Sequence, residues 1–130
     1  MTNTPSGPTA LELARARTSL QAARLLGDAG LAADAVSRAY YAIFHAASAL
    51  VASVGLSART HEGLRSLVGE HFIRTGQLAP AHGRTLSRIA GDRNDADYNV
   101  AAVFTAADVE EDITRATAFV EAVAKIVATT

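Results

Sequence analysis

The spacing of apolar residues between positions 36 and 54 constrains the fold more than any other feature of the sequence. These residues recur at steps of three and four: Val36, Ala39, Ile43, Ala47, Leu50 and Val54. This is the period of an α-helix with a buried face. A second stripe of the same segment is more polar and carries Arg38, Tyr41, His45 and Ser48. Because a helix that is apolar beyond one narrow stripe is usually buried against several neighbours, residues 32–54 are predicted to form the central helix.

Other segments show the same helical period, and none shows the two-residue alternation of a strand. The expected helices run from a Thr9–Glu12 capping box to about residue 26, from 32 to 54, from Thr60 to 75, from Pro80 to 97 or 98, and from a Thr105–Asp108 cap to about 127. Short connections make sequential helices antiparallel neighbours. The predicted fold is all-α: an antiparallel up-and-down bundle of four to five helices. It forms one domain over residues 9–130, after a disordered tail of residues 1–8.

Composition narrows the functional classes. The chain has no cysteine, which excludes disulfides and thiolate chemistry and is compatible with the cytoplasm, the expected location. A net charge of −1 gives no overall attraction to nucleic acid, so RNA binding would need a local basic patch. The most apolar run is too short and too polar to be expected to cross a membrane.

The sequence contains no motif for a cofactor or metal. It has no glycine-rich phosphate loop, no His-Glu-x-x-His and no dinucleotide fingerprint. None of the four histidines lies three or four residues from another, so no metal site is predicted. His71 is expected to be a hydrogen-bonded core histidine and His82 an exposed one. His61, at a helix start, is within reach of a site.

Arg93 is the most informative charged residue. It follows Leu86 and Ile89 on one helical stripe, so it is predicted to point into the bundle or an interface. Asp97, four residues on, can pair with it. Tyr98 lies about 140° around the helix from Arg93 and does not share its face unless the helix ends between them. Arg93 is therefore either an inward arginine paired within its own helix or a group that binds phosphate.

Three other arginines are candidate RNA contacts. Arg84 and Arg88, one turn apart, form a basic edge on the helix that carries Arg93, and Arg38 lies on the central helix.

Several motifs together resemble the HEPN superfamily, in particular the small stand-alone HEPN proteins encoded beside a minimal nucleotidyltransferase. The resemblance covers about residues 11–127. The motifs are Ser37-Arg38-Ala39-Tyr40-Tyr41 with the following Ala-Ile-Phe-His-Ala-Ala, Thr60-His61-Glu62-Gly63, the segment from Gly69 to Gly76, and Arg93-x-x-Ala96-Asp97-Tyr98.

The resemblance implies a helical bundle that forms a homodimer. In active members an Arg-x4-6-His motif from each protomer meets at the dimer interface and cuts RNA without a metal. The arginine contacts the scissile phosphate and the histidine transfers protons. Such members act as toxins or antiviral RNases, and the nucleotidyltransferase partner can neutralise some of them by modifying a tyrosine near the motif.

Arg93 matches the motif arginine and Asn94 the polar residue that often follows it, but Tyr98 stands in place of the histidine. Tyrosine has an ordinary pKa of about 10, against about 6.5 for histidine, and is a poor base at neutral pH. No histidine follows Tyr98. The resemblance thus implies a site of Arg93, Asn94, Asp97 and Tyr98. His45 is preferred to His61 as the base, because Tyr41 and Arg38 on its stripe could orient it.

Three functions remain open. The first is a toxin-like, metal-independent endoribonuclease with this degenerate Arg-x4-Tyr motif. The second is a catalytically silent HEPN module that binds a nucleotidyltransferase partner or a nucleotide. The third is a purely structural helical dimer.

Overall fold

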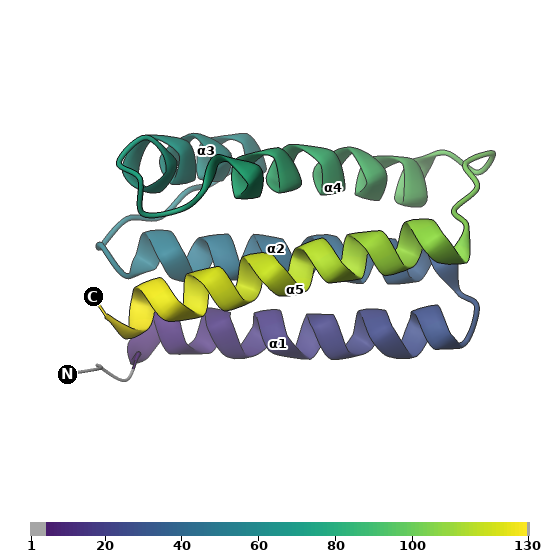
Figure 1. The fold of residues 1–130 in the computed structure, drawn as a ribbon, viewed down its shortest axis with the longest axis horizontal. Coiled ribbons are helices and arrows are strands. Elements are labelled where there is room, and N and C mark those ends of the chain that lie inside the picture. Colours follow the sequence, from purple (N-terminus) through teal and green to yellow (C-terminus); the bar gives the residue numbers. More distant parts are fainter. Residues whose placement is uncertain (1–4, 130) are drawn as a thin grey trace.

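Five α-helices and one π-helical segment form the described part of the chain, residues 5–129 of a computed structural model (Figure 1). The elements are α1 (Gly7–Asp28), α2 (Ala32–Ala52), α3 (His61–Val68), η1 (Gly69–Ile73), α4 (Pro80–Tyr98) and α5 (Ala106–Ala128). The helices α1, α2, α4 and α5 lie side by side, and those adjacent in sequence run in opposite directions. The prediction of an all-α antiparallel bundle is confirmed.

The central position of α2 is also confirmed, since this helix packs against α1, α3, α4 and α5. Its buried stripe includes Val36, Ala39, Ile43, Ala47 and Leu50. Many of the core residues of α2 are alanines, whose small side chains let neighbouring helices approach closely. The helix ends at Ala52, so Val54 lies beyond it and is half exposed instead of continuing the stripe.

The predicted start of α1 is wrong. The helix begins at Gly7, with Pro8 in its first turn, where a proline costs no hydrogen bond. Thr9 is consequently inside the helix and buried, and Glu12 bonds His45 instead of closing a capping box. Part of the expected tail is therefore helical, and residues 1–4 of that tail lie outside the described residues.

The later caps are confirmed. The Thr60 hydroxyl accepts from the Gly63 amide at 2.9 Å and starts α3. Thr105 and Asp108 form a reciprocal capping box at α5. The expected third helix changes at Gly69 into the π-helical η1, which ends at Ile73.

Two histidines differ from the prediction. His82 is half-buried, with the centre of its ring 5.8 Å from the centre of the Phe119 ring in an edge-on arrangement, so it is not the exposed residue expected. His71 is half-buried rather than part of the core. Among residues 5–129, no helix is long and apolar enough to cross a membrane.

Candidate functional site

The Arg93 side chain points from α4 towards α2 and the start of α3, and only 16% of it is exposed. Its Nη1 lies 3.4 Å from Asp97 Oδ2, which confirms the predicted pairing within the helix. The guanidinium carbon lies 4.6 Å from the centre of the Tyr40 ring, a cation–π arrangement. Its Nη2 lies 3.3 Å from Nδ1 of His61. Arg93 therefore has partners from three helices of one chain.

His61 is the first residue of α3, and the Thr60 cap fixes where this helix begins. Its Nδ1 also hydrogen-bonds the Tyr40 hydroxyl. Because a guanidinium only donates, Nδ1 is the accepting nitrogen and the ring proton lies on Nε2. Burial, and then the charge of Arg93, lower the pKa of His61 below its ordinary 6.5. The imidazole is thus neutral at neutral pH, with its basic nitrogen beside an arginine.

Asp97 and Tyr40 connect this group to α2. The Ser37 hydroxyl donates to Asp97 Oδ1, so the carboxylate links α2 to Arg93. Burial raises the pKa of Tyr40, although Arg93 acts in the opposite direction. Tyr40 therefore keeps its proton at neutral pH. We call Ser37, Tyr40, His61, Arg93 and Asp97 the Arg93 cluster.

One donor of the cluster is unused. Arg93 Nε is buried, and no acceptor within residues 5–129 bonds to it. The guanidinium is therefore not saturated by acceptors of its own chain.

The structure does not bring His45 or Tyr98 to Arg93. His45 faces α1, where its Nδ1 lies 2.7 Å from Glu12 Oε2. The α4 helix continues through Tyr98, so Tyr98 does not share the face of Arg93, and 74% of Tyr98 is exposed. Asn94 is exposed as well.

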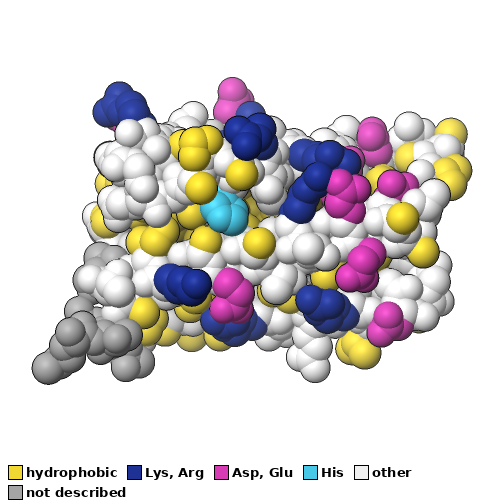
Figure 2. Space-filling model, in the orientation of Figure 1, with side chains coloured by type: hydrophobic (Ala, Val, Ile, Leu, Met, Phe, Trp, Pro, Cys, Tyr) yellow, Lys and Arg dark blue, Asp and Glu magenta, His cyan; other side chains and the backbone are white. Residues whose placement is uncertain are grey.

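Arg84 and Arg88 line a different cavity from the one beside the cluster, a cavity of about 470 Å³ that they share with Arg115 of α5. Arg88 and Arg115 both pair with Glu111. Arg38 lies over the Tyr41 ring, 5.2 Å from its centre. Arg38 approaches the cluster through Tyr41, whose ring centre also lies 6.0 Å from the guanidinium carbon of Arg93. On the face shown in Figure 2, Lys and Arg side chains alternate with Asp and Glu and do not form a continuous basic patch.

Reasoning from the sequence underrated His61 and did not place Tyr40 in the site. The available signal was the Thr-His pair, since a capping threonine marks where α3 begins and makes His61 its first residue. His45 was preferred because Tyr41 and Arg38 lie on the same stripe of its own helix. The contact between His61 and Arg93, in contrast, joins residues 32 apart in sequence.

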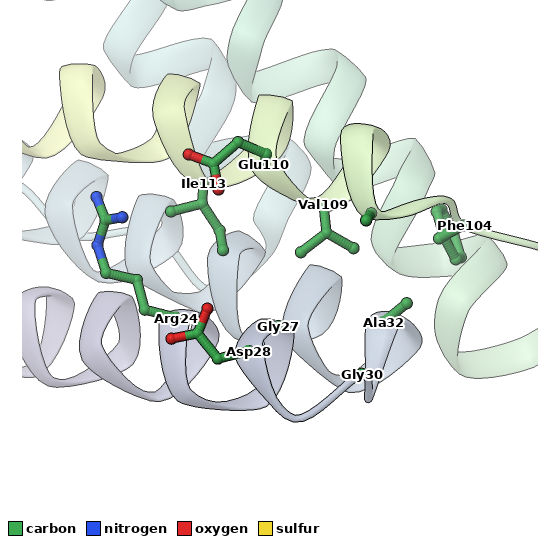
Figure 3. Close-up of a pocket in the computed structure, with 10 residues that line it drawn as sticks. Arg24, Gly27, Asp28, Gly30, Ala32, Phe104, Val109, Glu110 and Ile113 are labelled. Carbon is green, nitrogen blue, oxygen red and sulfur yellow. The ribbon is translucent and has the colours of Figure 1, made fainter.

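A cavity of about 360 Å³ adjoins the cluster between α2, α3 and α4. A second, of about 430 Å³, lies between the α1–α2 turn and the start of α5, and shares no lining residue with the first (Figure 3). The second cavity carries charges of both signs, from Arg24, Asp28 and Glu110, and Arg24 is already bonded to Thr117. In the part of the chain that the structure describes, no three His, Cys, Asp or Glu side chains are grouped to hold a metal.

The fold and the Arg93 cluster define a class: a helical bundle with a buried arginine beside a neutral histidine. The sequence matches the HEPN domain family over residues 11–127. This chain belongs to the HEPN domain family.

Three relatives illustrate the range of the family. The chain is 39% identical over 83 residues to a Methanocaldococcus jannaschii protein named a putative toxin, a match that covers 64% of this chain and 62% of that protein. It is 33% identical over 113 residues to a UPF0332 protein of Thermotoga maritima, covering 87% of this chain and 86% of the relative. A UPF0332 protein of Gloeobacter violaceus is 42% identical over 88 residues, covering 64% and 70% respectively.

Proposed function

We propose that this chain is a toxin-like HEPN protein that binds RNA at the Arg93 cluster and cleaves it slowly without a metal. The observation that carries the proposal is the 3.3 Å approach of Arg93 Nη2 to the basic nitrogen of His61 beside an open cavity. Two relatives of this chain are named putative toxins, which supports the toxin-like character.

The chemistry needs two groups that the cluster contains. When the 2′-hydroxyl of a bound ribose takes the place of the Tyr40 hydroxyl at His61 Nδ1, this nitrogen takes its proton, and the 2′-oxygen then attacks the adjacent phosphorus. Arg93 binds the phosphate and stabilises the negative charge that develops on its oxygens. The bond to the 5′-oxygen breaks and this oxygen takes a proton from water. The hydroxide that remains takes the proton from His61, which restores the base. The products are a 2′,3′-cyclic phosphate and a 5′-hydroxyl.

Slow cleavage follows from the position of Tyr98. With the motif histidine replaced by an exposed tyrosine, no side chain of the Arg93 cluster is suited to protonate the leaving oxygen. Loss of such acid catalysis typically costs about 10²–10⁴ in rate.

The test is cleavage of single-stranded RNA in EDTA, together with growth of cells that express the protein. The wild type is expected to cut slowly and leave cyclic phosphate ends. Arg93→Lys should reduce the rate at least roughly tenfold, because lysine loses the planar fork that binds phosphate. Arg84→Lys makes the same change at an exposed position of the same helix and should have little effect. RNA left uncut by the wild type, with growth unaffected, would contradict the proposal.

A second candidate is a catalytically silent HEPN module that binds a nucleotidyltransferase encoded nearby, or a nucleotide. The exposed Tyr98 favours it, because the position of the motif histidine faces solvent in the single chain. This alternative predicts uncut RNA and a complex with the nucleotidyltransferase that survives purification at several salt concentrations.

Both candidates include a cytoplasmic homodimer. An inward arginine without partners in its own chain would favour a dimer interface, but Arg93 has partners within the chain and gives no such support. Family membership and an exposed apolar group at the α4–α5 connection, Tyr98, Val100 and Val103, support the dimer instead. Light scattering at tens of micromolar should report twice the mass of the chain, and a monomer alone would contradict this prediction.

A further inference from the structure

Both aromatic and aliphatic side chains line the cavity beside the Arg93 cluster. Tyr40, Phe44 and His61 line it, with the Phe44 and His61 rings 4.6 Å apart and the Tyr40 and His61 rings 5.3 Å apart. The aliphatic residues that line it are Ile43, Leu64, Leu86 and Ala90. Of the three tyrosines and four phenylalanines of the chain, Tyr40 and Phe44 line this cavity.

The cavity has three charged residues in its lining, two arginines and one glutamate. Arg93 lies at the end shared with the cluster, and Glu62 and Arg65 of α3 complete the lining. Glu62 and Arg65 are both exposed, so they mark the side that faces solvent. A carboxylate accepts hydrogen bonds and a guanidinium donates them, which together match the mixed donors and acceptors on the edge of a nucleobase.

We propose that this cavity is a subsite for one nucleobase of the nucleotide whose phosphate Arg93 binds. The inference rests on the proposed phosphate contact of Arg93. The volume of the cavity, about 360 Å³, falls within the range of roughly 300–1,000 Å³ typical of small-ligand sites. Flat rings stack on aromatic side chains whatever the base, and this stacking supplies much of the affinity for single-stranded nucleic acid.

The geometry gives the two parts of a nucleotide separate partners. The guanidinium of Arg93 lies against the Tyr40 ring and the His61 ring, so a phosphate bound there is next to these two aromatic residues of the lining. Phe44 contributes its ring to the cavity, whereas the contacts of Arg93 are with Asp97, Tyr40, Tyr41 and His61. Phe44 can therefore be changed to test base binding apart from phosphate binding.

The experiment compares the four ribonucleoside 5′-monophosphates with ribose 5-phosphate, which has the same phosphate and sugar but no base. Binding is followed by NMR titration of the full chain. The nucleotides should bind roughly 5- to 150-fold more tightly, the effect expected of stacking one base. Phe44→Leu should remove most of this difference and leave ribose 5-phosphate binding unchanged. Phe104→Leu, the same change at a half-buried phenylalanine outside the cavity, should preserve the difference.

Equal binding of nucleotides and ribose 5-phosphate would overturn the proposal, as would an unchanged difference in a Phe44→Leu protein that circular dichroism shows to be folded. A short oligoribonucleotide identifies the source of the base: binding tighter than the mononucleotide indicates RNA, and equal binding indicates a free nucleotide. If base-dependent binding is found while RNA stays uncut, the cavity assignment holds and the proposed cleavage fails.

Discussion

At the scale of single residues, Arg93 acts on His61 by its charge as well as by contact. The positive guanidinium opposes protonation of an imidazole whose Nδ1 is 3.3 Å away, and burial opposes it more strongly. Both effects keep His61 neutral, the state in which it can accept a proton. The arginine that would bind the phosphate therefore also prepares the base.

This interaction predicts the titration of His61. In the wild type, the pKa of His61 should lie below 6.5. Arg93→Gln should raise it, because one of the two opposing effects is removed, but burial should still hold it below the ordinary value. The measurement is the pH dependence of the imidazole Cε1–H signal by NMR. Arg84→Gln, which removes an exposed charge from the same helix, should leave the titration unchanged, and a wild-type pKa at or above 6.5 would contradict the account.

The sequence predicted part of this arrangement. The inward direction of Arg93 and its pairing with Asp97 follow from spacing within one helix, and both are confirmed. The approach of His61 depends on how the connection between α2 and α3 crosses the bundle, which local spacing does not encode. For the same reason the bond from His45 to Glu12 across α1 and α2 was not expected.

At the scale of elements, the contact between α4 and α5 contains a buried carboxyl group. Asp112 of α5 is only 2% exposed, and its Oδ2 has no donor among residues 5–129. Burial, and then the neighbouring carboxyl of Asp92 on α4, raise the pKa of Asp112 from 3.8 to about 7, against the influence of Arg88 and Arg115. A proton shared between the two carboxyl groups supplies the missing donor.

The raised pKa sets a sign for the dependence of stability on pH. Between about pH 4 and pH 7 the folded chain binds more protons at Asp112 than the unfolded chain, so this group's contribution to stability is lost as pH rises through that window. His61 and His82 have lowered pKa values and act in the opposite direction below pH 6.5. A variant of Asp112 alone therefore separates its contribution to the pH dependence of stability from that of the two histidines.

Asp112→Asn should stabilise the fold at pH 8 by on the order of 1–2 kcal/mol and change it little at pH 5, because the amide donates where the ionised acid cannot. Urea unfolding at the two pH values measures this. Asp95→Asn, at an exposed carboxylate of α4, should show no such difference between the two pH values. An equal loss of stability in Asp112→Asn at pH 5 and at pH 8 would show that Asp92 and Asp112 do not share a proton.

Helix positions were predictable because their signals are local. The caps at Thr60 and Thr105 and the proline at the start of α4 were confirmed. Two errors came from influences outside the local pattern. Glu12 bonds His45, a residue of another helix, instead of forming the expected capping box. At η1, Ile73 packs against α4 so closely that a Cβ on Gly83 would lie 2.7 Å from its Cδ1.

At the scale of the whole molecule, the candidate site residues lie on two sides of α2. The side towards α3 and α4 holds Arg93, His61 and the cavity beside them, and the side towards α1 holds His45. Family membership alone does not choose between these sides, because the motif histidine is absent from this chain. We favour the Arg93 side, because there the Arg93 guanidinium lies 3.3 Å from Nδ1 of His61, whereas Nδ1 of His45 is bonded to Glu12.

The most direct test of this choice is the rate of RNA cleavage in EDTA by His61→Gln and His45→Gln, two identical changes on opposite sides of α2. If Arg93 and His61 form the functional centre, His61→Gln lowers the rate by roughly 10²-fold or more, while His45→Gln cleaves like the wild type. Both variants should remain folded by circular dichroism. Cleavage that survives His61→Gln and is lost in His45→Gln would contradict the account.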